Sequence, residues 1–175
     1  MKIRRATTED AKNIASVAIT TWVDTYAPEG MNDIYSEYVL DRFTAENVSA
    51  LINEHYVLVA ETDFGIVGYA LVSKSSEAKS EIETVYILPK FQGVGVGKAL
   101  MDAIVASHNN PLWLKCADYN PKALSFYRNF GFIETGETWF LLAGERYRCL
   151  VFELSHNKAL KAQPSAAGTP QSGAP

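Results

Sequence analysis

Three glycines at alternate positions, Gly93, Gly95 and Gly97, stand between an apolar stretch and a segment with helical spacing. The apolar stretch, residues 82–88, predicts a buried strand, and the proline after it ends a strand because proline lacks a backbone donor. The first N–H groups of a helix have no partner within it, and glycines let a ligand approach them closely. The pattern therefore predicts a phosphate site at the helix start.

Two common phosphate-binding motifs do not fit this loop. The P-loop needs Gly-Lys followed by Ser or Thr, whereas Gly97-Lys98 is followed by Ala99. The dinucleotide fingerprint Gly-x-Gly-x-x-Gly would place its third glycine on a lysine or a leucine, depending on the register. The pattern that remains is Gln92-x-x-Gly95-x-Gly97 after a strand.

A second motif lies between Asn120 and Phe132 and reads Asn-Pro-Lys-Ala-Leu-Ser-Phe-Tyr-Arg-Asn-Phe-Gly-Phe. Proline at its start and Gly131 near its end predict a short helix. This helix carries Tyr127, whose phenol can donate a proton or a hydrogen bond to a leaving group. Considered alone, Tyr127 is better explained as a buried aromatic residue of an amphipathic helix.

Together the two motifs resemble those of the Gcn5-related N-acetyltransferase (GNAT) superfamily, Arg/Gln-x-x-Gly-x-Gly/Ala and Asn-x-x-Ala-x-x-Phe-Tyr-x-x-x-Gly-Phe. The resemblance implies acetyl-coenzyme A as co-substrate and no metal. It implies that the backbone of Val85, Tyr86 and Ile87 pairs with the pantetheine arm, and that one of their N–H groups holds the oxyanion. The residues that it assigns to the pyrophosphate are Gln92, Gly93, Val94, Gly95, Val96, Gly97 and Lys98. An ordinary solvent-facing lysine of the helix explains the Lys98 side chain equally well.

The same resemblance gives roles to the second motif. It implies that Asn120 contacts the coenzyme arm and that Tyr127 sits beside the thioester sulfur. In that setting the catalytic interpretation of Tyr127 is preferred to the packing one.

Amide formation from a protonated amine needs a base, and two carboxylates lie at the start of the central strand. Glu81 and Glu83 alternate with Ile82, which predicts that both share the face of Val85 and Ile87. Glu83 is the preferred base because it is nearer the reacting centre, and Glu81 is assigned to substrate binding. A water chain as the base, with the carboxylates only orienting substrate or water, is an open alternative.

The acceptor site is expected between the first two helices and the last strands. Trp22-x-x-Thr25-Tyr26 is similar to a signature in a GNAT branch that includes polyamine acetyltransferases, which implies that Trp22 and Tyr26 bind the acceptor. Up to Glu61 the chain has ten acidic and five basic residues, a balance that suits a cationic amine. Ordinary solvated helix faces explain most of these acids equally well.

Composition and charge exclude several classes of protein. A chain of 175 residues that is 47% hydrophobic can form one core, and its net charge of −4 argues against a nucleic-acid partner. No apolar run reaches the length of a membrane span or forms a signal peptide. Cys116 and Cys149 have no CxxC or histidine partner, which indicates reduced, buried thiols and a cytoplasmic location. A monomer and a homodimer both fit the sequence.

The expected elements follow an α+β order. Strands are predicted at residues 2–6, 56–61, 66–72, 82–88, 112–117, 132–142 and 146–154. Helices are predicted from residue 7 to about 23, in two pieces within 32–54, after the glycines, and at 122–130. The order matches the GNAT fold, with a mixed, mostly antiparallel sheet of about seven strands and about four helices. Residues 1–157 are predicted to form the acetyltransferase domain, and residues 158–175 a disordered tail or an expression remnant.

The predicted function is direct transfer of an acetyl group from acetyl-coenzyme A to a primary amine, such as a polyamine or another small amine. Neither cysteine lies in a nucleophile motif, so no acetyl-enzyme is expected. One alternative acceptor is a protein N-terminus or lysine. An alternative of another class is a domain that senses acyl-coenzyme A without turnover.

Overall fold

A computed structural model of the chain describes residues 1–73, 79–142 and 145–154. In these residues one seven-stranded sheet has the order β1-β2-β3-β4-β5-β7-β6. Its strands are β1 (Lys2–Arg5), β2 (Tyr56–Thr62), β3 (Gly65–Val72), β4 (Ser80–Ile87), β5 (Leu112–Ala117), β6 (Ile133–Leu142) and β7 (Glu145–Leu154). Only β4 and β5 pair in parallel. The predicted mixed, mostly antiparallel α+β sheet is confirmed, while the predicted tail lies outside the described residues.

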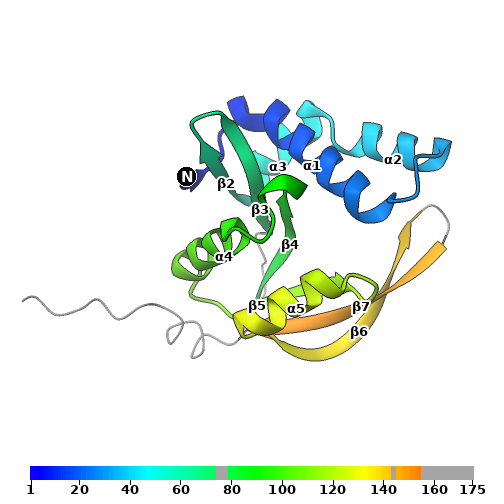
Figure 1. Cartoon of the computed structure of the whole chain (residues 1–175). Coiled ribbons are helices and arrows are strands. Elements are labelled where there is room, and N and C mark those ends of the chain that lie inside the picture. The colour runs from blue at the N-terminus through cyan, green and yellow to red at the C-terminus, as the bar shows by residue number, and fades with distance from the viewer. Residues whose placement is uncertain (74–78, 143–144, 155–175) are drawn as a thin grey trace, which may run out of the picture.

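Helices cover both faces of the sheet (Figure 1). They are α1 (Ala11–Tyr26), α2 (Asp33–Arg42), α3 (Ala45–Glu54), α4 (Val96–Ser107) and α5 (Pro121–Phe130), with short 3₁₀ turns at Thr8–Asp10 and Pro89–Phe91. The predicted division of residues 32–54 into two helices is confirmed. It occurs at Thr44, whose Oγ1 accepts a hydrogen bond from the N–H of Asn47 and so caps α3. Helix α1 extends to Tyr26, almost a turn beyond the predicted end.

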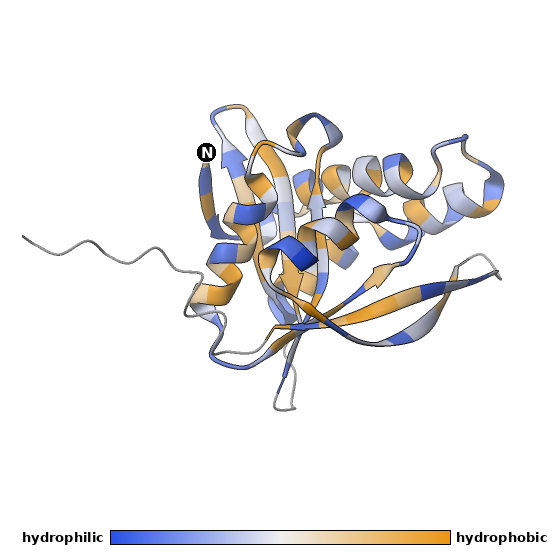
Figure 2. Ribbon diagram, turned by 60° about the horizontal axis from the view of Figure 1, so that its bottom comes forward, coloured by the Kyte–Doolittle hydropathy of each residue, from blue (hydrophilic) through white to orange (hydrophobic). Residues whose placement is uncertain are grey.

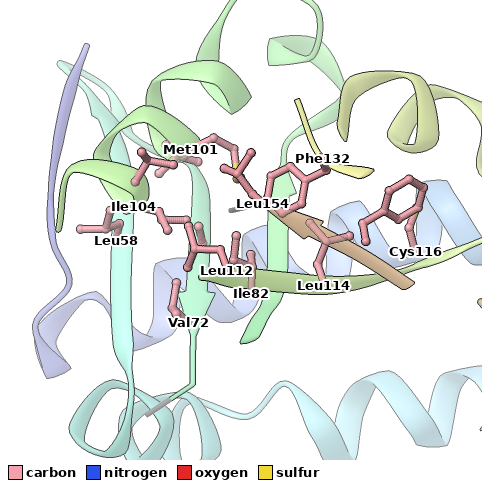
Figure 3. Close-up of a cluster of buried hydrophobic side chains, with 14 of the residues drawn as sticks. Leu58, Val72, Ile82, Met101, Ile104, Leu112, Leu114, Cys116, Phe132 and Leu154 are labelled. Carbon is pink, nitrogen blue, oxygen red and sulfur yellow. The ribbon is translucent and has the colours of Figure 1, made fainter. Parts of the chain in front are cut away.

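The largest cluster of buried side chains lies between α4 and the sheet (Figure 3). Met101 and Ile104 of α4 pack in this cluster with Leu58 of β2 and Leu114 of β5, which are far apart in sequence. The cluster continues to Phe132, which follows α5. Met101 and Ile104 are fully buried, and truncating such a residue to alanine typically costs about 2–5 kcal/mol. The cluster therefore fixes where α4 begins relative to β4. Hydrophobic and hydrophilic residues alternate as orange and blue bands along the helices in Figure 2.

The opposite face carries two further clusters. One packs α1 and α3 on β2 and β3, through side chains such as Ile14, Ile52 and Tyr69. The other surrounds Trp22 at the end of α1 and includes Phe140 and Tyr147 from the β6–β7 hairpin. The N-terminal helices and the C-terminal hairpin, which are distant in sequence, thus meet on this face.

Strands β4 and β5 separate after a very short pairing. Ser80 pairs with Leu112 and Glu81 with Trp113, and no further pair follows. Figure 1 shows β4 turning toward α4 and the N-terminal half while β5 continues toward β7. One edge of β4 is consequently left without a neighbouring strand in the middle of the sheet. Among the described residues, no helix is long and apolar enough to span a membrane.

Candidate active site

The open edge of β4 presents backbone groups of alternate residues. On its other edge β4 pairs with β3, and the N–H of Leu88 donates to the oxygen of Val67 at 2.9 Å. Backbone groups of an antiparallel strand alternate between its two edges. The groups of Tyr86 therefore point toward β3, and those of Val85 and Ile87 point toward the open edge. Of the three residues expected to pair with the coenzyme arm, two present their backbone there.

The side chain of Gln92 supports this assignment of the two edges. Its Nε2 donates a hydrogen bond to the backbone oxygen of Ile87 at 3.1 Å, from the side away from β3. Gln92 thus ties the loop after β4 to the end of the open edge, which positions the glycines that follow.

A β-bulge interrupts β4 at Glu83. Ile82 pairs with Val72 and Thr84 with Leu71, so Glu83 is an extra residue with no counterpart on β3. The side chain of Ile82 packs in the same cluster as those of Val85 and Ile87, which strict alternation would not allow.

The predicted common face of the two glutamates is therefore wrong for Glu81. Because Glu81 precedes Ile82 on the regular part of the strand, it points to the opposite face. There its Oε1 forms an ion pair with the Nζ of Lys115 on β5 at 2.8 Å. Glu83 is exposed at the bulge, where the open edge of β4 begins.

The glycine loop forms a concave turn of backbone at the start of α4. Gly93 and Gly95 have φ angles of 76° and 94°, which only glycine adopts without strain, and Gly95 is the N-cap of the helix. The first helical hydrogen bond runs from the N–H of Ala99 to the oxygen of Gly95. The N–H groups of Val96, Gly97 and Lys98 precede that bond, so they point out of the helix start, as an anion site requires.

Gly97 is the point where the loop, β4 and α5 meet. A Cβ at this position would lie 3.0 Å from Cδ1 of Ile87 and 3.3 Å from Cζ of Phe126. Glycine is thus required by close packing, a reason that the motif alone did not reveal. The nearby Lys98 pairs its Nζ with Asp102 at 2.7 Å on the exposed side of α4, so its side chain is directed to that carboxylate.

Asn120 is the N-cap of α5. Its Oδ1 accepts a hydrogen bond from the N–H of Ala123 at 3.1 Å, and proline follows at the first helical position. At the other end Gly131, with a φ of 111°, terminates the helix. These two caps fix the length and register of α5, and thereby the position of Tyr127 on it.

Tyr127 is half-buried on α5 against the α4 cluster. Its ring centroid lies 5.2 Å from that of Phe126 and 5.8 Å from that of Phe132. Burial raises the pKa of its phenol well above the ordinary value, and the nearby Cys116 and Tyr26 add to the effect. The hydroxyl is therefore protonated throughout the usual assay range and is available as a donor.

Tyr26 and Tyr86 meet on the other face of the sheet. Burial raises the pKa of Tyr26 to about 12, and the neighbouring Tyr86 opposes this rise only in part. Trp22 is only 2% exposed, and its ring lies 5.2 Å from that of Tyr26. Trp22 therefore packs against the buried side of Tyr26. Of the two aromatic residues in the Trp-x-x-Thr-Tyr signature, Tyr26 is the one nearer the gap between β4 and β5.

The two cysteines are buried on neighbouring strands, as predicted, and both are free thiols. Burial raises the pKa of Cys116 to about 12 and also raises that of Cys149. Both thiols are therefore protonated near neutral pH.

The sequence of the chain matches known acetyltransferases. The family model for the acetyltransferase (GNAT) family matches residues 16–132, which include both the glycine loop and α5 up to its C-cap. An uncharacterized N-acetyltransferase of Mycobacterium bovis is 27% identical over 139 residues, covering 76% of this chain and 89% of the relative. An uncharacterized N-acetyltransferase of Mycobacterium tuberculosis strain H37Rv matches equally well.

Solved structures share the fold. The PaiA N-acetyltransferase of Thermoplasma acidophilum, solved in complex with coenzyme A, superposes with a TM-score of 0.74 at 20% identity, over 88% of this chain and 98% of that one. The ribosomal-protein-alanine N-acetyltransferase of Brucella melitensis gives a TM-score of 0.65 at 23% identity, over 89% and 99%. Because the family model matches residues 16–132, more than half of the chain, the chain belongs to the acetyltransferase (GNAT) family and is an N-acetyltransferase.

Proposed function

We propose that this enzyme transfers the acetyl group of acetyl-coenzyme A directly to a small primary amine, between the separated strands β4 and β5. The observation that carries the proposal is the open edge of β4, which begins at Glu83 and ends beside the glycine loop. An edge of this kind accepts an extended ligand as an added strand.

The residues present fit the three parts of the co-substrate. The N–H groups of Val96, Gly97 and Lys98 suit the pyrophosphate, because they point out of a helix start built on glycines with positive φ. The backbone groups of Val85 and Ile87 suit the amides of the pantetheine arm. One of these N–H groups can also stabilise the oxyanion that forms when the amine attacks the thioester.

Two side chains are proposed to handle protons. Glu83 is exposed at the bulge and is positioned to take a proton from the acceptor ammonium, directly or through water. Tyr127 is kept protonated by burial, so its hydroxyl can donate to the departing thiolate. Glu81 is a weaker choice for the base because it is already paired with Lys115.

Direct transfer is favoured over an acetyl-enzyme intermediate. A cysteine nucleophile reacts as the thiolate, and burial holds the pKa values of Cys116 and Cys149 above their ordinary value. Neither thiol is therefore prepared to attack a thioester near neutral pH.

The test is coenzyme A release from acetyl-coenzyme A with a panel of amines. The panel contains spermidine, spermine, amino acids, aminoglycosides, arylalkylamines and short peptides, and free thiol is detected. Release that depends on one small amine would support the proposal. Tight binding of acetyl-coenzyme A without release for every amine would instead support a sensor domain.

Two acceptor classes compete within this function. A polyamine acceptor rests on the Trp22-x-x-Thr25-Tyr26 signature and on the acidic N-terminal half. A protein N-terminus is the acceptor suggested by the Brucella melitensis enzyme, which shares the fold. The amine panel separates the two, because only the second predicts turnover of peptides and none of free polyamines.

A further inference from the structure

We propose that the acceptor is an amine with a single positive charge and an apolar or aromatic carbon skeleton, recognised by a series of aromatic rings that we call the ring network. The ring network consists of Tyr38, Trp22, Tyr26, Tyr119, Tyr147 and Phe140. This inference rests on the proposed acetyltransferase function and names the substrate class for that same site.

The rings form a continuous series across the molecule. Ring centroids lie 5.2 Å apart for Tyr38–Trp22 and for Trp22–Tyr26, and 6.3 Å apart for Tyr26–Tyr119. The series continues at 5.7 Å for Tyr119–Tyr147 and 5.3 Å for Tyr147–Phe140. All of these separations are within the range of aromatic contacts. The network therefore joins α1 and α2 to the loop before α5 and to the β6–β7 hairpin, three regions distant in sequence.

The middle of the network approaches the reacting groups, and the neighbouring Tyr119 faces solvent. Tyr26 and Tyr86, which is on β4, both pack against the cluster around Trp22, and Tyr26 also contributes to the raised pKa of the Tyr127 phenol. Tyr119, next to Tyr26, is 44% exposed. A ligand that enters along Tyr119 therefore passes Tyr26 before it reaches the open edge of β4.

The acidic side chains of α1 and α2 do not line the network. In α2 the residues that pack around Trp22 are Tyr35, Tyr38 and Val39. The acidic residues of α2, which are Asp33, Glu37 and Asp41, recur at intervals of four residues and are exposed. Around the helix axis, the centre of these three residues is roughly 150° from the centre of the residues that pack around Trp22. In α1, Asp24 is likewise on the side opposite Trp22 and Tyr26. The negative charge that suggested a polycation thus faces away from the rings.

The carboxylates on the C-terminal side are already paired with basic side chains. Arg148 on β7 pairs with Glu137 at 2.7 Å and with Asp118 at 3.7 Å. Glu81 pairs with Lys115, as described above. Of the carboxylates near the gap that the structure describes, this leaves Glu83, which can match one ammonium.

The ring network and the carboxylate of Glu83 together suit an amine with one positive charge and an aromatic or apolar skeleton. Aromatic faces attract both an ammonium and another aromatic or apolar surface. A polyamine would bring two or three further charges against rings and paired carboxylates, and an uncompensated charge taken from water is costly. The 2-phenylethylammonium ion carries one charge and one ring, and it is therefore the probe of choice.

Binding is measured by calorimetry on the full chain saturated with coenzyme A, so that no turnover is needed. We expect 2-phenylethylamine to bind at least tenfold more tightly than spermidine. Tyr119→Leu should lower the affinity for 2-phenylethylamine by about fivefold to tenfold, which is the value of one aromatic contact, and leave the affinity for spermidine unchanged. Tyr119→Phe keeps the ring and should retain the wild-type affinity. Phe64→Leu, at the fully exposed β2–β3 turn, is the matched control.

Each outcome decides the inference. Equal or tighter binding of spermidine, or a Tyr119→Leu variant with wild-type affinity for 2-phenylethylamine, would overturn it. Tyr119 is partly exposed, so its replacement is not expected to prevent folding, and a thermal melt verifies this. If 2-phenylethylamine binds as expected but no amine releases coenzyme A from acetyl-coenzyme A, the proposed function fails while the binding class stands.

Discussion

The two sides of the β4–β5 gap are built by different means. On the α4 side, the parts assigned to the co-substrate are backbone groups, presented by a glycine loop, a helix start and a strand edge. On the α1 side, the parts assigned to the acceptor are side chains from four separate segments, held together by ring contacts. One side is therefore local in sequence, and the other exists only after the chain has folded.

This difference has a functional consequence. A backbone site recognises what every acetyl-coenzyme A molecule shares, and its demands on side chains are limited to small size and to positive φ. A side-chain site can change with single substitutions while the fold persists. We therefore expect mutations on the α4 side to affect affinity for the co-substrate, and mutations on the α1 side to change which amine is accepted.

The largest effect is expected where the two sides meet, at Glu83. Glu83→Gln keeps the shape but removes the base, so kcat should fall by about 10²–10⁴ with the best amine. The loss should shrink as pH rises, because a free amine needs no base. The pH profiles of wild type and variant are compared, with Glu37→Gln on the outer face of α2 as the control. Superimposable profiles would show that Glu83 is not the base.

Tyr127→Phe should have the next largest effect, on chemistry rather than on binding. A hydrogen bond to a charged group is worth about 1.5–3 kcal/mol, so the single-turnover rate should fall by roughly 10-fold to 100-fold. The affinity for acetyl-coenzyme A should barely change, because negative charge on the sulfur develops only during transfer. Since burial raises the pKa of this phenol, no alkaline loss of activity should arise from it below pH 10. A variant that reacts at the wild-type single-turnover rate would make Tyr127 a packing residue.

Gly95→Val isolates the α4 side of the comparison. A β-branched residue at a φ of 94° is strained by about 1–3 kcal/mol, which corresponds to roughly a fivefold to hundredfold loss of affinity for acetyl-coenzyme A. Gly65→Val is the matched control, since Gly65 has a φ of 133° at the start of β3, away from the site. Calorimetry that finds equal affinity in a folded Gly95→Val variant would refute the pyrophosphate assignment.

The smallest effect concerns how α1 is anchored to the sheet. Arg4 on β1 binds Asp10, ahead of α1, at 2.7 Å and Glu61 on β2 at 2.8 Å. We expect Arg4→Met to lower the free energy of unfolding by about 1–2 kcal/mol at pH 7, with unchanged affinity for acetyl-coenzyme A.

The pH dependence of this anchor follows from Asp10. Its hydrogen bonds with Arg4 lower its pKa from 3.8 to about 2. The stabilisation is fully present above the unfolded value and is lost as pH falls through the folded one. Urea titrations should therefore show the difference between wild type and Arg4→Met shrinking between pH 4 and pH 2. A difference that stays constant over this range would rule out the ion pair as its source.

The sequence by itself determined the parts whose cause is local. Alternate glycines, a proline after a strand and an Asn-Pro helix start are read directly from neighbouring residues, and they predicted the loop, α4 and α5. Runs of β-branched and apolar residues predicted the strands in the same way, because strand propensity depends on residues that are neighbours in the chain.

Only the tertiary structure decided the rest. The bulge at Glu83 depends on how β4 meets β3, and it changed which face Glu81 occupies, so the regular alternation read from the sequence failed there. The requirement for glycine at Gly97 comes from Ile87 and Phe126. No regular sequence spacing links Tyr26, Tyr119 and Tyr147. These residues meet because β4 separates from β5 and because the β6–β7 hairpin packs against α1 and α2. Contacts between residues so distant in the chain leave no periodic signal in the sequence, and they form only when the complete sheet and its helices are assembled.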